Sequence, residues 1–216
     1  MIQVYKETFS ERQVYRYRIT DEEDRLVYLM EPTGLFLPNP TWQITLLGAD
    51  GLPIGRVEPP DPARGPWGGE YTVALEGWAS PLVIREHWEL VDLMLLRLPR
   101  YLFCWEGAPY MARGSRFGEI FYAIFPYAPA SGETLPEGTP AEGVPGDIAD
   151  LDLARWEAVV EEETRRWGEP VGAIWRPSRG PHYQAEAWTP LLQDASLMLA
   201  VLVVLADLHL QEREGE

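Results

Sequence analysis

The segment DASLMLAVLVVLADLHL, residues 194–210, is the most apolar stretch of the chain and decides its fold class. Its uncharged part, residues 195–206, is twelve residues long. As a helix rising about 1.5 Å per residue, it would cover roughly 18 Å, against about 30 Å for the hydrocarbon core of a bilayer. Lengthening the span would bury Asp194 and Asp207, which lipid strongly disfavours. We therefore expect no transmembrane segment.

The apolar side chains of this segment surround a helix axis instead of forming one stripe, so such a helix has to be buried on every side. Full burial of eight of them, at about 1.5–3 kcal/mol each, gives a gross gain of roughly 10–25 kcal/mol. A central β-strand is the alternative, because the segment is rich in valine. Its length and the N-cap position of Asp194 favour a helix. The eight side chains are Leu197, Met198, Leu199, Val201, Leu202, Val203, Val204 and Leu205.

The region from Val14 to Phe125 has the pattern of short strands and turns. VYRYRIT and RLVYLM flank the turn DEED, and TWQITLL and LPIGRVE flank GADG, whose Asp50-Gly51 pair is a strong hairpin signal. Strands are expected again in VGAIWR and HYQAEAW, residues 171–176 and 182–188. Short strands separated by Gly and Pro indicate an all-β barrel or sandwich. A closed antiparallel barrel around a buried C-terminal helix satisfies both patterns.

The 216 residues can bury one good core, so we expect a single domain over residues 1–216. Within it, the Pro-, Gly- and Glu-rich residues 128–147 are expected to form a flexible loop. A surface helix is expected over about 148–167, and the central helix over about 191–210.

Composition limits the function. The formal charge of −16 makes nucleic-acid binding unfavourable, because phosphate backbones repel an acidic chain. Of the 18 basic residues, Lys6 is the only lysine. Cys104 is the only cysteine, which excludes an intramolecular disulfide and fits a reducing compartment. The N-terminal residues lack the apolar core of a secretory signal, so a soluble, cytoplasmic protein is expected.

The side chains that most often carry catalysis are scattered in this sequence. Cys104 lies within the apolar strand YLFCWEG, and a buried structural cysteine is the favoured interpretation. The three histidines, His87, His182 and His209, have no metal-ligand spacing. For His209, a place at a helix end, where a cation complements the dipole, is expected. We therefore expect no catalytic, cofactor or metal site, and the ligand-binding residues stay undefined.

Two kinds of charged cluster in the sequence are candidate ligand sites. The acidic clusters lack the pattern of an EF-hand and are expected to be a turn, a helix start and a solvated helix face. The arginine pairs could grip a phosphate or carboxylate, but salt bridges to the chain's own carboxylates are the favoured interpretation. The acidic clusters are Asp21-Glu22-Glu23-Asp24, Asp147/Asp150/Asp152 and Glu161-Glu162-Glu163; the arginine pairs are Arg16/Arg18 and Arg113/Arg116.

The order of these segments resembles the tubby C-terminal-like fold, in particular its LURP-one-related and phospholipid-scramblase-like branch. The resemblance is carried by YRYRITDEEDRLVYLM, TWQITLLGADGLPIGRVE, PVGAIWRPSRGPHYQAEAW and the terminal DASLMLAVLVVLADLHL, and covers residues 14–210. It implies about twelve strands wrapped around a hydrophobic C-terminal helix.

The chain departs from the family at its ligand sites. Tubby proteins grip phosphoinositides with a lysine and arginine patch, and no residue here matches it. Scramblases have an acidic calcium-binding segment beside the terminal helix, where this chain has only Asp194. The resemblance therefore implies a non-enzymatic binding or scaffold module with an unknown protein or lipid partner, and peripheral membrane association stays open. A carrier of a small apolar ligand is the alternative, and a hydrolase using Cys104 or carboxylates beside a histidine is a third class.

Overall fold

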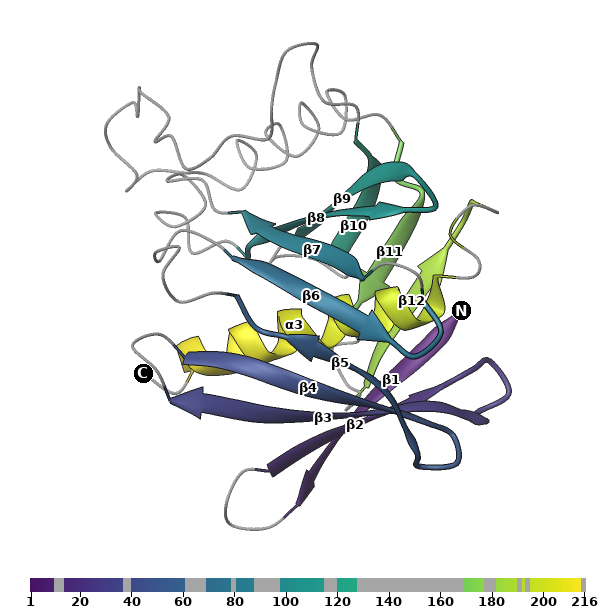
Figure 1. The fold of residues 1–216 in the computed structure, drawn as a ribbon. Coiled ribbons are helices and arrows are strands. Elements are labelled where there is room, and N and C mark those ends of the chain that lie inside the picture. The colour runs from purple at the N-terminus through teal and green to yellow at the C-terminus, as the bar shows by residue number, and fades with distance from the viewer. Residues whose placement is uncertain are drawn as a thin grey trace.

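The structure is a computed structural model, and it describes residues 1–9, 14–36, 40–60, 69–78, 81–87, 98–114, 120–127, 169–176, 182–189, 192 and 195–214. It confirms the expected fold class: twelve antiparallel strands close into one barrel around a C-terminal helix (Figure 1). The strands are β1 Ile2–Phe9, β2 Val14–Thr20, β3 Leu26–Phe36, β4 Pro40–Gly48, β5 Pro53–Glu58, β6 Glu70–Leu75, β7 Leu82–His87, β8 Arg100–Trp105, β9 Ala108–Gly114, β10 Ile120–Pro126, β11 Gly172–Trp175 and β12 His182–Ala187.

Each strand pairs with its neighbours in the sequence, and β1 closes the barrel by pairing with β12. The closure is antiparallel, with Val4 opposite Tyr183 and Ile2 opposite Ala185. Because the chain forms a simple up-and-down meander, all hairpins at one end of the barrel follow the even-numbered strands. Closure leaves no free sheet edge among these strands.

Side chains alternate between the lumen and the outside along the strands, as the pleat requires. In β7, for example, Leu82, Ile84 and Glu86 are buried, whereas Val83 is 41% exposed. Gly55 occupies a tight point of the wall, where a Cβ would lie 2.2 Å from the carbonyl oxygen of Ala74. Any larger residue at this position would push β5 away from β6.

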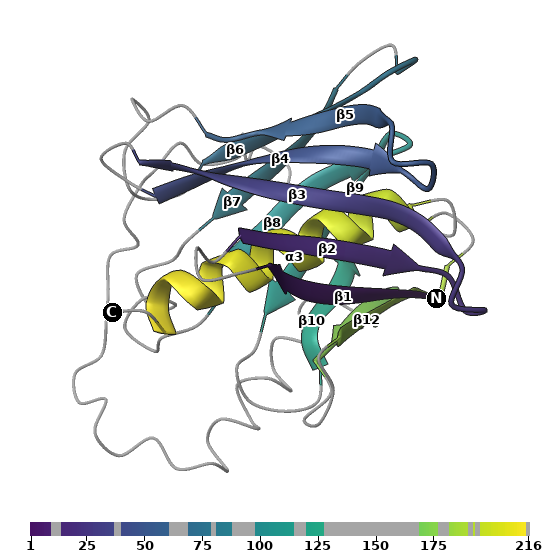
Figure 2. The same ribbon diagram turned by 90° about the horizontal axis from the view of Figure 1, so that it is seen from below.

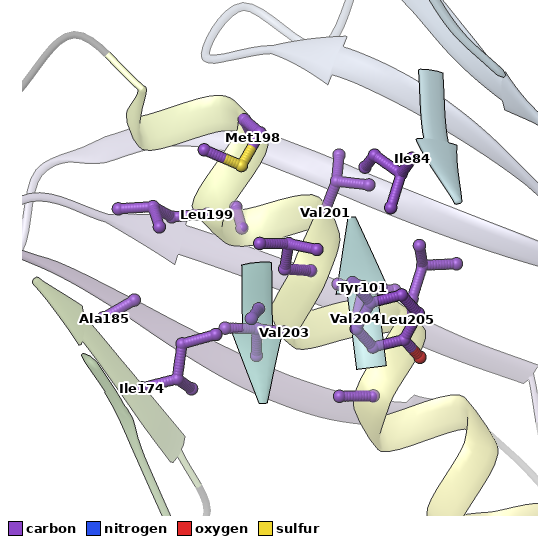
Figure 3. Packing of buried hydrophobic residues seen from close by; sticks show 14 of the residues in the cluster. Ile84, Tyr101, Ile174, Ala185, Met198, Leu199, Val201, Val203, Val204 and Leu205 are labelled. Atoms are coloured by element: carbon purple, nitrogen blue, oxygen red, sulfur yellow. The ribbon is translucent and has the colours of Figure 1, made fainter. Parts of the chain in front are cut away.

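The helix α3, Ser196–Glu214, runs through the barrel (Figures 1 and 2). Every side chain from Leu197 to Ala206 is at most 6% exposed. Figure 3 shows these side chains directed towards opposite walls, with Ile84 of β7 and Tyr101 of β8 on one side and Ile174 of β11 and Ala185 of β12 on another. The helix has no polar face because it contacts the sheet on every side.

The helix boundaries differ from the expected 191–210. The helix begins at Ser196, and before it the amide of Leu192 donates to the carbonyl of Thr189 and the amide of Ala195 to that of Leu192, at 3.1 and 3.0 Å. Each of these bonds joins residues three apart, the spacing of a 3₁₀ turn. At the other end the helix continues to Glu214. The expected cap Asp194 lies outside the described residues.

One strand was missed in the sequence. β1 lies before the region in which strands were expected, yet it forms the closing seam of the barrel. Its inward positions are Ile2, Val4 and Lys6, so the apolar alternation ends at a charged residue. The expected loop 128–147 and surface helix 148–167 lie outside the described residues. Among the residues that the structure describes, no helix is long and apolar enough to cross a membrane.

Candidate functional site

A charged group lies inside the barrel, on the helix itself. Asp207 of α3 is 5% exposed, and its carboxylate accepts hydrogen bonds from the hydroxyls of Tyr17 and Tyr183, the first at 2.5 Å. The ammonium of Lys6 lies 3.2 Å from the same carboxylate. A buried carboxylate is tolerated only when it is paired and hydrogen-bonded. These four side chains meet that condition and are called the Asp207 cluster below.

The strands bring the Asp207 cluster together because its members are direct neighbours in the sheet. Lys6 of β1 stands opposite Tyr17 of β2, and Tyr183 of β12 lies on the other side of β1. The Lys6 ammonium also lies 4.3 Å from the ring centroid of Tyr15. The ring of Tyr15 and the carboxylate of Asp207 therefore flank the chain's only lysine.

A second polar contact joins the helix to the opposite wall. His209 Nε2 lies 2.9 Å from Glu86 Oε1, and Glu86 on β7 is 8% exposed. In the closed order of twelve strands, β7 lies six strands from β1 in either direction. Asp207 and His209 are two residues apart, which turns a helix by roughly 200°. The two side chains therefore leave opposite faces of α3 and reach opposite walls.

Together these contacts can fix how α3 sits in the lumen. The apolar contacts of the helix are not directional, so by themselves they specify its rotation and height less sharply than polar contacts do. Hydrogen bonds and ion pairs are directional, and a one-residue shift would leave buried charges unpaired. We infer that Asp207 and His209 define the rotation and axial position of the helix.

Beside Glu86 lies a fully enclosed tyrosine. Burial, with Tyr122 and Glu86 nearby, raises the pKa of Tyr101 well above its ordinary 10.0. Because the folded-state pKa is the higher one, this group leaves stability unchanged below the unfolded pKa and lowers it as the pH rises towards the folded pKa. We expect the free energy of unfolding of Tyr101→Phe, from urea titrations, to fall less steeply above pH ~10 than that of the wild type. Equal slopes would contradict this.

The structure corrects the interpretation of Cys104 as buried. It is exposed on the outer face of β8, because the buried neighbours Tyr101 and Phe103 take the inward positions of the strand. The apolar residues next to Cys104 in the sequence lie on both faces of β8, but only the inner face of this strand is buried. His209 lies in the lumen, so the sheet separates the thiol from that imidazole.

Exposure of Cys104 leads to a direct prediction. We expect the native protein to react with a thiol-specific maleimide to one equivalent per chain, as fast as the urea-unfolded protein within about threefold. Intact mass measured over time checks the stoichiometry and rate, with Cys104→Ser as the unreactive control. Labelling that requires denaturant would show that the thiol is covered.

The histidines are not brought together. His87 is the last residue of β7, His182 lies against the ring of Tyr5 with centroids 4.9 Å apart, and His209 faces Glu86. The expected role of His209 at a helix end is wrong, since α3 continues to Glu214 and the imidazole contacts a carboxylate of the wall. Among the described residues, no group of His, Cys, Asp and Glu has a metal-binding arrangement.

The first acidic cluster is a hairpin turn, as expected. The Asp21 carboxylate accepts the amides of Glu23 and Arg25 at 3.0 and 2.9 Å. It also pairs with the Arg25 guanidinium, and the hydrogen bond from the Arg25 amide is the main cause that lowers the pKa of Asp21. The clusters Asp147/Asp150/Asp152 and Glu161-Glu162-Glu163 lie outside the described residues.

The arginines of β2 pair with the protein's own carboxylates, as expected. The guanidinium of Arg16 donates to Glu31 at 2.8 Å. Arg18 lies 3.3 Å from Glu7 and 3.4 Å from Asp24, and its guanidinium also covers the ring of Tyr5 at 4.3 Å. Arg113 lies on β9, and Arg116 is outside the described residues.

A partly open depression of about 360 Å³ lies where α3 begins. Glu22, Glu186, Ser196 and Leu199 are among the residues that line it. It is open to the outside and mostly polar, unlike the enclosed apolar pocket that a small hydrophobic ligand requires.

The residues of the Asp207 cluster were missed in the sequence. In the sequence, Asp207 is the charge that ends the apolar run, and Tyr17 and Tyr183 lie within ordinary strand patterns. Two signals were available: one carboxylate inside an apolar helix, and one lysine in a chain whose other cations are arginine. Neither signal identifies its partner, because Tyr17 lies 190 residues from Asp207 in the sequence and Tyr183 lies 24 residues from it, on a different element.

In comparisons with known protein families, curated proteins and solved structures, none gives a significant match to this chain.

Proposed function

We propose that this chain is a non-enzymatic binding or scaffold module that acts through its outer surface. The filled lumen carries the proposal: Val201, Leu202 and Val203 of α3 are at most 1% exposed in the middle of the barrel. Barrels that carry small apolar ligands keep that space open. With the helix in it, the binding capacity of this protein lies in its hairpins and outer strand faces.

The placement of the reactive side chains supports a function other than hydrolysis. A cysteine hydrolase needs a thiol within hydrogen-bonding reach of its base. Here the one cysteine lies outside the barrel, and the Glu86–His209 pair lies inside it. The Glu86–His209 pair holds the helix against β7, so we assign these two side chains a structural role.

The chemistry of the chain supports a proposed location in the cytoplasm. The net charge of −16 favours protein partners over nucleic acids. An exposed single thiol suits a reducing compartment, which supports a cytoplasmic location. Tubby-like kinship remains part of the proposal, supported by the agreement between the barrel-and-helix order and the one that the resemblance implies.

Native mass spectrometry of the gently purified protein tests this function. We expect the mass of the polypeptide alone, and no enhancement of an apolar fluorescent dye on titration. Leu202→Ala with Leu205→Ala is the positive control, because the cavity it opens in the lumen should admit such a dye. A lipid that copurifies at one equivalent and is lost on unfolding would favour the carrier instead.

A further inference from the structure

The hairpins at the end of the barrel where α3 begins carry an unusual combination of side chains. Three consecutive tips, residues 49–52, 76–78 and 105–107, are called the hairpin rim below. In Figure 1 they lie at the same end of the barrel as the N-terminus. The β4–β5 tip presents Leu52 at 62% exposure and the β6–β7 tip presents Trp78 at 41%. Large apolar side chains at neighbouring tips are typical of contact surfaces.

The three tips are held to one another, so the rim is a defined surface. The amide of Glu76 donates to the carbonyl of Ile54 at 2.9 Å, which joins the second tip to the strand leaving the first. The ring of Trp78 lies 5.8 Å from the ring of Trp105, which joins the second tip to the third. Trp78 is thereby positioned with part of its ring still exposed.

The charge of the rim is entirely negative. Asp50, Glu76 and Glu106 are exposed, one at each tip, and the three segments contain no Lys, Arg or His. Among the described residues, neither Glu76 nor Glu106 forms an ion pair. Elsewhere on the wall, carboxylates are neutralised locally, as in the pairs Arg16–Glu31 and Arg85–Glu70. At the next tip along the same end, residues 21–25, the carboxylates are instead paired with Arg25, Arg18 and the N-terminal ammonium.

We propose that the hairpin rim binds a basic protein segment that carries an apolar side chain. An arginine or lysine of the partner would lie against the exposed face of Trp78 and near the carboxylates of the rim, while its apolar residue packs on Leu52. A membrane is the less suitable occupant, because the anionic lipids of cytoplasmic surfaces repel three carboxylates. This inference rests on the proposed function, since it names the class of partner for the outer surface.

The test uses the full chain and a short fluorescent peptide of alternating arginine, glycine and leucine, with binding followed by anisotropy. A peptide in which glutamate replaces arginine is the charge control. We expect the arginine peptide to bind the wild type and the glutamate peptide not to bind. Because each 1.4 kcal/mol is a factor of ten, Leu52→Ser with Trp78→Ser should weaken binding about tenfold or more. Glu76→Gln with Glu106→Gln should weaken binding similarly and reduce its salt dependence.

Matched variants separate a site from general attraction to an acidic protein. Glu7→Gln with Glu58→Gln removes two carboxylates near the other ends of β1 and β5. Trp188→Ser removes a tryptophan of similar exposure, 47%, that follows β12. Both should bind within about twofold of the wild type. An environment-sensitive dye on Cys104, two residues before Glu106, should respond to the peptide only when the rim is intact.

Three results would overturn the proposal: no binding to the wild type, equal losses in rim and control variants, or binding to phosphatidylcholine vesicles that depends on Trp78. The last would assign the rim to a membrane. These outcomes test the rim separately from the proposed function. If the lumen is filled but the rim has no partner, the native mass spectrum still shows the polypeptide alone, and only the peptide experiment fails.

Discussion

Leu202→Asp is expected to remove the cooperative unfolding transition or to yield only insoluble protein. Leu202 is 1% exposed and lies in the middle of α3, with sheet on all sides. The substitution places an unpaired carboxylate where water does not reach, at a cost of several kcal/mol, which is comparable to the whole stability of a domain. Thermal melting followed by circular dichroism measures the effect.

Leu52→Asp is the matched control for this variant. It is the same substitution at a leucine that is 62% exposed, so its melting temperature should stay within a few degrees of the wild type. A folded Leu202→Asp protein with an unchanged melt would contradict a helix enclosed by the barrel.

The second large effect is expected at Asp207, five residues after Leu202 on the same helix. Asp207→Asn removes the negative charge to which Lys6 is paired and weakens the hydrogen bonds from Tyr17 and Tyr183. Breaking one side of a buried pair costs about 3–5 kcal/mol, and we expect about 3 because the Lys6 side chain is 23% exposed. Urea unfolding of the variant, with the m-value checked, gives this free energy.

A double-mutant cycle shows whether the loss of stability in Asp207→Asn comes from leaving the Lys6 ammonium without its partner. Lys6→Met alone leaves Asp207 with two tyrosine donors, whereas the double variant removes both charges together. We expect the double variant to be more stable than the Asp207→Asn single variant, with a coupling energy of at least about 1 kcal/mol. Additive losses would mean that Lys6 and Asp207 do not stabilise each other. The control is a second cycle with Lys6→Gln and Arg56→Gln, two charges that have different partners. Their effects on the free energy of unfolding should be additive.

The fold was predictable because its deciding features are local or periodic. The apolar run without a polar face required enclosure, and the Asp50-Gly51 turn formed the hairpin that it indicates, with Gly51 at φ 77°. β1 was missed for an equally local reason. Its inward position at Lys6 is polar, which interrupts the alternation that marks a half-buried strand.

The internal polar contacts were not predictable, because they depend on which strands meet across the closure. Tyr17 and Tyr183 reach Asp207 only when β1 pairs with both β2 and β12. Glu86 meets His209 only because β7 lies across the lumen from that seam. The exposure of Cys104 was not predictable for a similar reason. The sequence of a strand does not show which of its two faces is buried.

Hydrogen exchange of the native protein, read by mass spectrometry, tests the central claim that α3 is an integral part of the barrel core. The account predicts that the backbone amides of residues 199–206 exchange only through global unfolding, at the same free energy as those of β4 and β10. Exchange of α3 at a much lower free energy, while the strands remain protected, would show a helix that leaves the lumen without unfolding the barrel, and would contradict the account.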